Sequence, residues 1–211
     1  MFDYSLLHWT TFLTAAVLLN ISPGPDIAFI LGQTVRGGRK SGFAAMFGIW
    51  TGAFGHVLMA AAGLSVILAT SATAFSVVKW AGAAYLIWLG IQALRSDGGK
   101  FVSDGVAEDL PARSIYKQGV FVGLLNPKVA VFFLAFLPQF VVEGSGPVSA
   151  QLFLHGFLII VVAALIEPPL ILLGGKLTDK LRGNPSIGKW MDRSLGAIFV
   201  ALGLRLAMEK Q

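Results

Sequence analysis

The chain has 211 residues, of which 55% are hydrophobic and 13% are charged, and it contains no cysteine. A soluble domain carries roughly a quarter of charged residues, so this composition excludes an ordinary soluble domain and indicates an integral membrane protein. The lack of cysteine excludes disulfides and cysteine-based metal sites or nucleophiles, and the net charge of +5 is expected to reflect basic cytoplasmic loops rather than nucleic-acid binding.

Six apolar stretches are long enough to cross a bilayer as α-helices, which takes roughly 20 residues each. They cover residues 5–34, 42–69, 74–95, 115–141, 148–174 and 189–208. We therefore predict an all-α integral membrane protein with a single membrane domain over residues 1–211. The start of the chain lacks the basic segment of a secretory signal, so we expect the first stretch to be a membrane helix.

Lysine and arginine are concentrated on one side of the predicted membrane. Twelve of the 16 lie in or beside the segments that join stretches 1 and 2, 3 and 4, and 5 and 6. By the positive-inside rule these segments are cytoplasmic, so both termini are expected outside. The segment 96–114 also carries acidic residues and a Gly-Gly pair, and we expect a mobile polar linker there.

Two of the six stretches are interrupted by proline next to a charged residue. Residues 18–26 read LLNISPGPD, and residues 124–128 read LLNPK. Proline removes a backbone donor and glycine loosens a helix, so helices 1 and 4 are predicted to be broken. For either break alone, a plain proline kink, which many membrane helices tolerate, is the alternative interpretation.

The two breaks occupy matching positions in the two halves of the chain. Helices 3 and 6 match as well, since both begin with Lys-Trp and end in a similar Leu-Gly motif. These matches predict half-repeats over 1–95 and 115–208, and an odd number of helices in each half makes the second half inverted. Inverted repeats with broken helices are typical of secondary transporters.

Three ionisable residues lie well inside apolar stretches, namely Asp26, Lys128 and Glu167. Each costs a few kcal/mol near the bilayer centre unless it faces a partner or water. Asp26 and Lys128 either form a structural ion pair or bind the two ends of a zwitterion. Both interpretations are correct if the substrate opens the ion pair when it binds. Glu167 precedes two prolines, and a low dielectric favours a protonated carboxylate. It is therefore a candidate proton carrier, although a Glu facing a polar seam explains it equally well.

The candidate substrate-binding residues are those at the two breaks, and the candidates for proton coupling are the two buried acids. The first set is Asn20, Ser22, Pro23, Gly24, Pro25, Asp26, Asn126, Pro127 and Lys128, and the second is Asp26 and Glu167. The helix that starts at Pro25 presents N–H groups and a positive dipole end, which favour an anion such as a carboxylate.

Other polar and small residues receive structural interpretations. His56 and His155 are expected to be hydrogen-bonded groups rather than proton relays, and His8 is assigned no role. Trp50 could line a cavity or face another helix. Gly48, Gly52 and Gly55 form a small-residue pattern that packs helices within the chain or between protomers of a homo-oligomer, and packing within the chain is the default expectation. Gly-x-Ser-x-Gly, His-Glu-x-x-His and phosphate-binding motifs are absent from the sequence, so no enzyme, metal or cofactor is expected.

Four sequence blocks resemble those of the LysE/RhtB amino-acid exporter family. They are SPGPD at 22–26 with RGGRKSG at 36–42, GIWTG at 48–52, AGAAYLIWLG at 81–90, and GVFVGLLNPK at 119–128. The resemblance is closer to the homoserine/threonine-export branch than to the lysine-export branch. It implies six helices, a bacterial inner membrane, in which the outward termini are periplasmic, and export of amino acids or close analogues driven by the proton gradient. It places functional emphasis on Pro23, Gly24, Pro25, Asp26, Asn126, Pro127 and Lys128, whereas the interest of Glu167 rests on physical argument alone.

The sequence therefore predicts a secondary exporter of small zwitterions in the lipid bilayer. Substrate from the cytoplasm binds at the two broken helices, and a proton moving inward resets the cycle. A passive small-solute channel is the first alternative, because it shares the fold and differs only in coupling. A membrane scaffold subunit without transport is the second, and the charges at the paired breaks argue against it.

Overall fold

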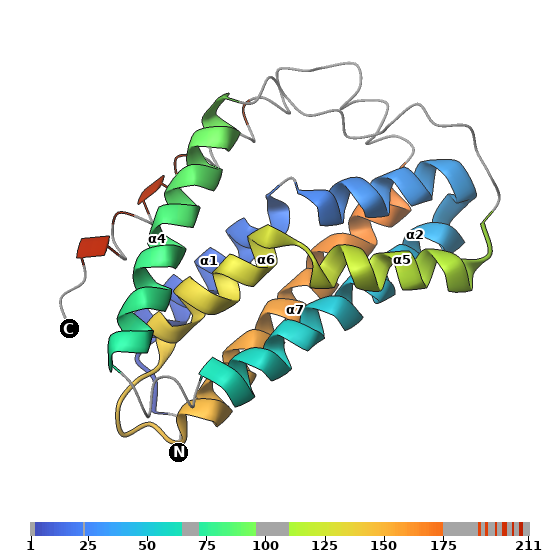
Figure 1. The fold of residues 1–211 in the computed structure, drawn as a ribbon. Helices are drawn as coiled ribbons and strands as arrows, with labels where there is room; N and C mark the ends of the chain where they lie inside the picture. The colour runs from blue at the N-terminus through green and yellow to red at the C-terminus, as the bar shows by residue number, and fades with distance from the viewer. Residues whose placement is uncertain are drawn as a thin grey trace.

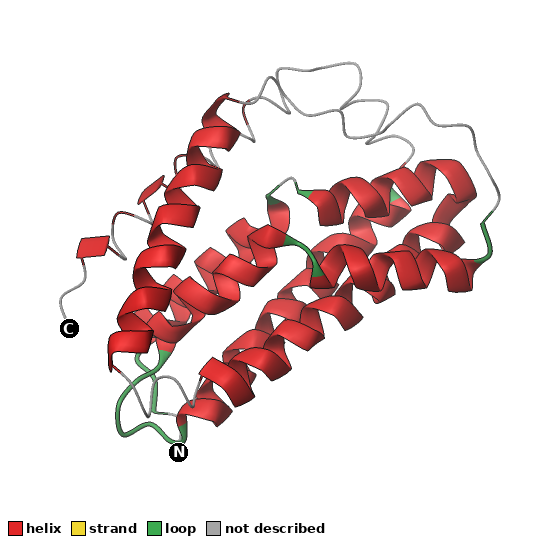
Figure 2. Ribbon diagram, viewed as in Figure 1, coloured by secondary structure: helices red, strands yellow, loops and turns green. Residues whose placement is uncertain are grey.

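The computed structural model describes residues 3–22, 24–64, 72–95 and 110–174, together with isolated positions between 190 and 208. Every regular element in these residues is a helix and none is a strand, as Figure 2 shows. The predicted all-α class is thus confirmed for this part of the chain. Pro23, the linker residues 96–109 and nearly all of the sixth predicted helix lie outside the described residues.

The first predicted helix is broken as expected. Helix α1 spans Leu6–Ile21, and α2 begins at Pro25 after a short extended segment. Helix α2 runs to Met59 and continues into a π-helical turn, η1, over Ala60–Leu64. Two residues inside α2, Gly37 and Gly38, are not helical, and Gly38 has a φ of 71° that suits glycine. The chain turns back on itself there (Figure 1), so α2 contains the second part of predicted helix 1 and residues 42–59 of predicted helix 2.

The remaining elements follow the predicted order. They are α4 (Ala72–Arg95), α5 (Ala112–Leu124), α6 (Pro127–Val131), the π-turn η2 (Phe132–Phe136), the 3-10 turn η3 (Leu137–Phe140) and α7 (Val148–Leu172). The second predicted break therefore lies between α5 and α6. Helix α5 begins at Ala112, inside the segment 96–114 that was expected to be a linker, and the Pro111 carbonyl accepts from the N–H groups of Ser114 and Ile115.

Two described stretches are long and apolar enough to cross a membrane, Pro25–Gly63 and Val148–Leu172. Helix α1 is apolar but only 16 residues long, and α5 has 13 residues. The breaks divide predicted helices 1 and 4 into these shorter pieces, whereas nearly all of the sixth predicted helix lies outside the described residues.

The buried apolar side chains form two clusters. One includes Phe12, Leu19, Val57, Phe133 and Ile159, and the other includes Ile30, Ile49, Ile115 and Ile171. Each broken helix passes from one cluster to the other, and so do α7 and the second arm of α2. The residues of the breaks therefore lie between two apolar cores, together with Glu167 of α7.

Helices α2 and α5 pack closely through glycines on both sides. A Cβ atom on Gly52 would lie 2.6 Å from the Leu124 nitrogen, and one on Gly123 would lie 2.5 Å from the Ile49 oxygen. Both distances are far below van der Waals contact with backbone atoms that cannot move aside. Gly48 and Gly119 make the same kind of contact, so the expectation that the glycine pattern packs helices within the chain is confirmed.

Replacing Gly52 by alanine is expected to destabilise the protein by about 1–3 kcal/mol, because the added methyl group overpacks the α2–α5 contact. Gly32→Ala is the matched control, since a Cβ at Gly32 meets no atom within 4 Å. The control should be neutral or stabilising by up to about 1 kcal/mol through helix propensity. Thermal unfolding of the detergent-solubilised variants measures both, and equal melting temperatures would contradict the packing argument.

Candidate functional site

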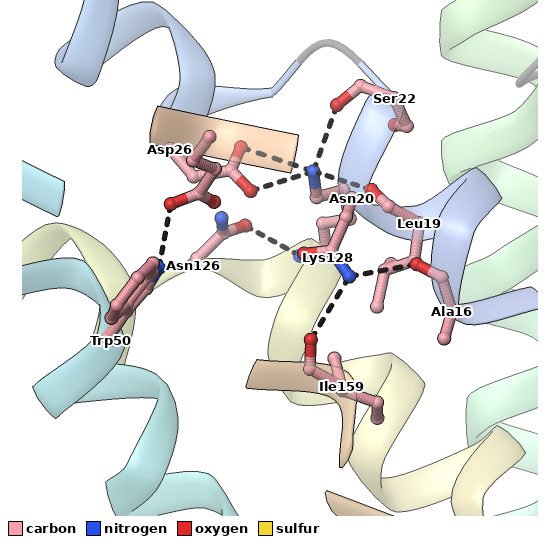
Figure 3. Close-up of polar contacts among 10 residues, drawn as sticks. Ala16, Leu19, Asn20, Ser22, Asp26, Trp50, Asn126, Lys128 and Ile159 are labelled. Atoms are coloured by element: carbon pink, nitrogen blue, oxygen red, sulfur yellow. Dashed lines mark hydrogen bonds and ion pairs between the residues drawn. The ribbon is translucent and has the colours of Figure 1, made fainter. Parts of the chain in front are cut away.

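The two helix breaks meet at one point of the fold (Figure 3). Lys128, in the first turn of α6, extends its side chain into the gap between α1 and α2. Its Nζ atom lies 2.9 Å from Asp26 Oδ2 and 3.1 Å from Asp26 Oδ1. Both side chains are buried, with 6% and 9% of their surface exposed. The ion pair that the sequence left as one of two interpretations is therefore formed.

The ammonium group of Lys128 also bonds to the end of α1. Nζ donates to the carbonyl oxygens of Ser22 at 3.1 Å and Leu19 at 3.3 Å. Carbonyl groups in the last turn of a helix have no partner within the helix, and the negative dipole end there favours a cation. Asp26 occupies the first turn of α2, where the opposite dipole end favours an anion. The pair thus places each charge against the helix end that stabilises it.

Two buried polar atoms beside the ion pair have no hydrogen-bond partner among the described residues. They are Oγ of Ser22 and Nδ2 of Asn126, and the two residues are 4% and 1% exposed. The other end of the Asn126 amide caps α6, because Oδ1 accepts from the Lys128 N–H at 3.0 Å. Figure 3 shows the Asn126 amide on the side of Asp26 and Trp50. An unpaired buried polar group costs about 1–3 kcal/mol, so both atoms are suited to receive a polar ligand.

Gly24 lies so close to the ion pair that a side chain would not fit. A Cβ atom there would lie 2.6 Å from Asp26 Oδ1 and 2.9 Å from Lys128 Nζ. The glycine of the sequence motif is therefore needed for close approach of the backbone to the two charges. Its φ of −160° is ordinary extended geometry, so space and not conformation requires glycine here.

The prolines and Asn20 contribute structure at the breaks. Pro25 and Pro127 each occupy the first turn of a helix, where a missing N–H group costs nothing. Asn20 Nδ2 donates to the Ala16 carbonyl at 2.8 Å and the Ile159 carbonyl at 3.3 Å. The amide of Asn20 thus ties α1 to α7, and its donor group is already used.

Glu167 of α7 lies in the same polar layer as the Asp26–Lys128 pair, between the two apolar clusters. Its hydrogen bond there is to Trp50, a contact that the sequence did not predict. Its Oε2 atom accepts from Trp50 Nε1 at 2.7 Å, and the residue is 2% exposed. Glu167 is near enough to Asp26 and Lys128 to interact electrostatically with both. Trp50 therefore faces another helix and fixes the carboxylate. The hydrogen bond between the Trp50 indole and Glu167 could have been predicted only if the packing of α2 against α7 had been known.

His56 completes the lining of the second break. Its Nε2 atom lies 2.9 Å from the carbonyl oxygen of Leu124, the last residue of α5. A carbonyl at this position lacks a helical partner. The expected structural role of His56 is thereby confirmed.

The chain matches the family model described as LysE type translocator over residues 17–210. It is 32% identical to the homoserine/homoserine lactone efflux protein of Salmonella typhi, with 94% of this chain and 95% of the relative covered. It is 30% identical to the leucine efflux protein of Klebsiella pneumoniae subsp. pneumoniae, with 97% of each chain covered. An uncharacterized membrane protein of Vibrio cholerae is 29% identical, with 96% of this chain and 97% of the relative covered. No solved structure gives a significant match.

The chain belongs to the LysE type translocator family. The resemblance predicted from the sequence blocks is thus confirmed. As a LysE type translocator the chain is a membrane transporter and not an enzyme. Its ion pair and helix breaks are therefore features of a transport protein.

The Asp26–Lys128 pair of this translocator is expected to be strongly coupled. Asp26→Asn and Lys128→Met should each cost about 3–5 kcal/mol of stability, because each leaves the other charge buried and unpaired. The double variant should cost less than the sum, with a coupling free energy of about 1–3 kcal/mol. Denaturant unfolding in detergent measures the cycle, and additive losses would mean that the two charges do not stabilise each other.

Proposed function

We propose that this chain exports amino acids or similar small zwitterions across the bacterial inner membrane by proton antiport. The proposed substrate-binding residues are those of the two breaks, with the Asp26–Lys128 pair at their centre. The observation that carries the proposal is this buried pair, formed where four helix ends meet and flanked by the unpaired polar atoms of Ser22 and Asn126.

Charge balance favours a zwitterion as the substrate. The two charges of the pair cancel, so a zwitterion that enters between them leaves the site neutral. Its carboxylate would contact Lys128 and the N–H groups at the start of α2, and its ammonium would contact Asp26 or Glu167. A lone cation or anion would instead leave one charge of the pair buried without a partner, which costs several kcal/mol. The names of the two efflux relatives specify homoserine, homoserine lactone and leucine, of which homoserine and leucine are zwitterions.

The proposed architecture is six transmembrane helices in two inverted three-helix repeats, with both termini in the periplasm. Three features support it, namely the matching Leu-Leu-Asn motifs, the side-by-side breaks, and the Lys and Arg residues of the predicted cytoplasmic loops. Cytoplasmic substrate would bind at the breaks, and movement of one half against the other would open the site outward.

Glu167 and Asp26 are the proposed proton carriers. Glu167 lies in the same polar layer as the pair, is almost fully buried, and accepts from Trp50. A proton on either acid changes the charge of the layer by one and so alters how well it holds the ammonium group of a substrate. Protons moving inward after substrate release would return the transporter to its cytoplasm-facing state.

Uptake by inside-out membrane vesicles with an acidic lumen tests the proposal, because export becomes uptake in this orientation. Labelled homoserine, leucine and a wider amino-acid panel serve as substrates. We expect at least one amino acid to accumulate and to leak out when the gradient is collapsed. Asp26→Asn and Lys128→Ala should each reduce uptake about 100-fold, corresponding to about 3 kcal/mol, with normal membrane insertion. Equilibration without accumulation would favour a passive channel, and normal uptake by both variants would remove the proposed site.

Glu167→Gln is expected to separate proton coupling from substrate binding. Glutamine can still accept from Trp50 but cannot bind or release a proton. We expect gradient-driven accumulation to be lost while exchange of labelled for unlabelled substrate continues. Glu143→Gln is the matched control, since Glu143 is an exposed carboxylate in the loop before α7 and should leave both activities unchanged. Wild-type accumulation by Glu167→Gln would exclude Glu167 as the coupling acid.

A further inference from the structure

A second polar cluster lies at the other end of α1, away from the helix breaks. His8 in the first turn of α1 and His155 of α7 face each other, with their Nε2 atoms 2.8 Å apart. His155 is 1% exposed, whereas His8 is half-buried. Figure 1 shows the N-terminus of the chain beside the start of α7. The hydrogen bond between His8 and His155 therefore connects the N-terminal parts of α1 and α7.

The hydrogen bonds of His155 fix the direction of the bond between the imidazoles. Nδ1 of His155 lies 2.8 Å from the carbonyl oxygen of Gln151. A carbonyl oxygen only accepts, so this nitrogen must carry a hydrogen. A neutral His155 then has a lone pair on Nε2, and His8 must donate its own Nε2–H to it.

The groups around the two imidazoles are aromatic or amide groups. Tyr4 stacks on His8 at 4.3 Å, and its hydroxyl donates to Gln151 Oε1 at 3.0 Å. Burial raises the pKa of Tyr4, which keeps this hydroxyl protonated. A positive charge on His8 disfavours a positive charge on His155. Four aromatic rings contact the two imidazoles. They belong to Tyr4 before α1, Trp9 and Phe12 of α1, and Phe140 of η3.

This geometry limits how many protons the joined pair can hold. One extra proton can occupy Nδ1 of His8 without disturbing the bond. A proton on Nε2 of His155 would set two N–H groups against each other at 2.8 Å, so the bond would break. Joined imidazoles therefore hold at most one extra proton, whereas separated imidazoles hold two. Because the separated state binds more protons, its population rises as the pH falls.

We propose that His8 and His155 form a second proton-binding site, a latch between α1 and α7 that parts when the solution at that end becomes acidic. The assignment of this end to the outer face rests on the proposed orientation. In that orientation, protons from the acidic side of the membrane would release the outer ends of α1 and α7.

The latch is connected to the ion pair through the same two helices. The far end of α1 and its C-cap supply the Leu19 and Ser22 carbonyls that bind Lys128, and Leu19 lies about 16 Å along the helix from His8. The far end of α7 carries Glu167. A change in how α1 packs against α7 at His8 would therefore shift the carbonyl groups that bind Lys128 relative to Glu167.

Distance measurements between two spin labels test the latch without requiring transport. The chain has no cysteine, so Thr10→Cys on α1 and Ser149→Cys on α7 provide unique labelling positions, both exposed. With the protein in lipid nanodiscs, we expect one distance population at pH 8. A second, longer population should grow as the pH is lowered from 8 to 5, by up to tenfold relative to the first per pH unit for each proton of difference.

Histidine variants assign the response. His8→Phe keeps an aromatic ring against Tyr4 but removes the shared hydrogen bond, and should make the distances independent of pH. His56→Gln, which removes the third histidine of the chain, should retain the response. Distances in the wild-type protein that do not change between pH 8 and pH 5 would overturn the proposal, as would a response that survives in His8→Phe. A pH response without any vesicle uptake would support the latch and reject the proposed function, whereas uptake with pH-independent distances would do the reverse.

Discussion

The fold is organised around the cost of placing two charges in an apolar medium. An isolated Asp26 or Lys128 would cost several kcal/mol among apolar side chains, so each must meet the other and its remaining hydrogen-bond partners. The broken helices provide these partners at the ends of α1 and α2. A continuous helix would have neither free carbonyls for the ammonium group nor a dipole end for the carboxylate. The breaks and the charges therefore require each other.

Once the pair is in place, most other polar groups of the layer are used for structure. Asn20 is bonded to α7, Trp50 to Glu167, and His56 to the end of α5. Ser22 Oγ and Asn126 Nδ2 differ because nothing in the described part of the chain satisfies them. This division separates side chains whose polar groups already hold the helices in place from two side chains whose polar atoms have no partner among the described residues.

The features that could be predicted from the sequence are those with a signal in neighbouring residues. Proline and glycine within apolar stretches gave the positions of both breaks, and the rarity of charges there singled out Asp26, Lys128 and Glu167. The reversal at Gly37 and Gly38 was placed within a few residues, because the basic segment marked it as a loop. The contacts of Trp50 and His8 could not be foreseen, since each partner lies more than 100 residues away and depends on how α7 packs. The hydrophobic periodicity of a sequence shows which face of a helix is buried only if the faces differ in polarity. It therefore cannot show how helices that are apolar on every face pack against each other.

Helix α1 links the two ends of the molecule because it is short and held at both ends. Its first turn is fixed by the cap at Ser5 and by the bond from His8, and its last turn by Lys128 and Asn20. A rigid helix held in this way cannot tilt at one end without changing its contacts at the other. Four hydrogen bonds from α1 to α6 and α7 would thus share any rearrangement between the proposed halves. Lys128 joins both segments of the first break to α6, since it pairs with Asp26 of α2 and also bonds to the carbonyl oxygens of Leu19 and Ser22 at the end of α1.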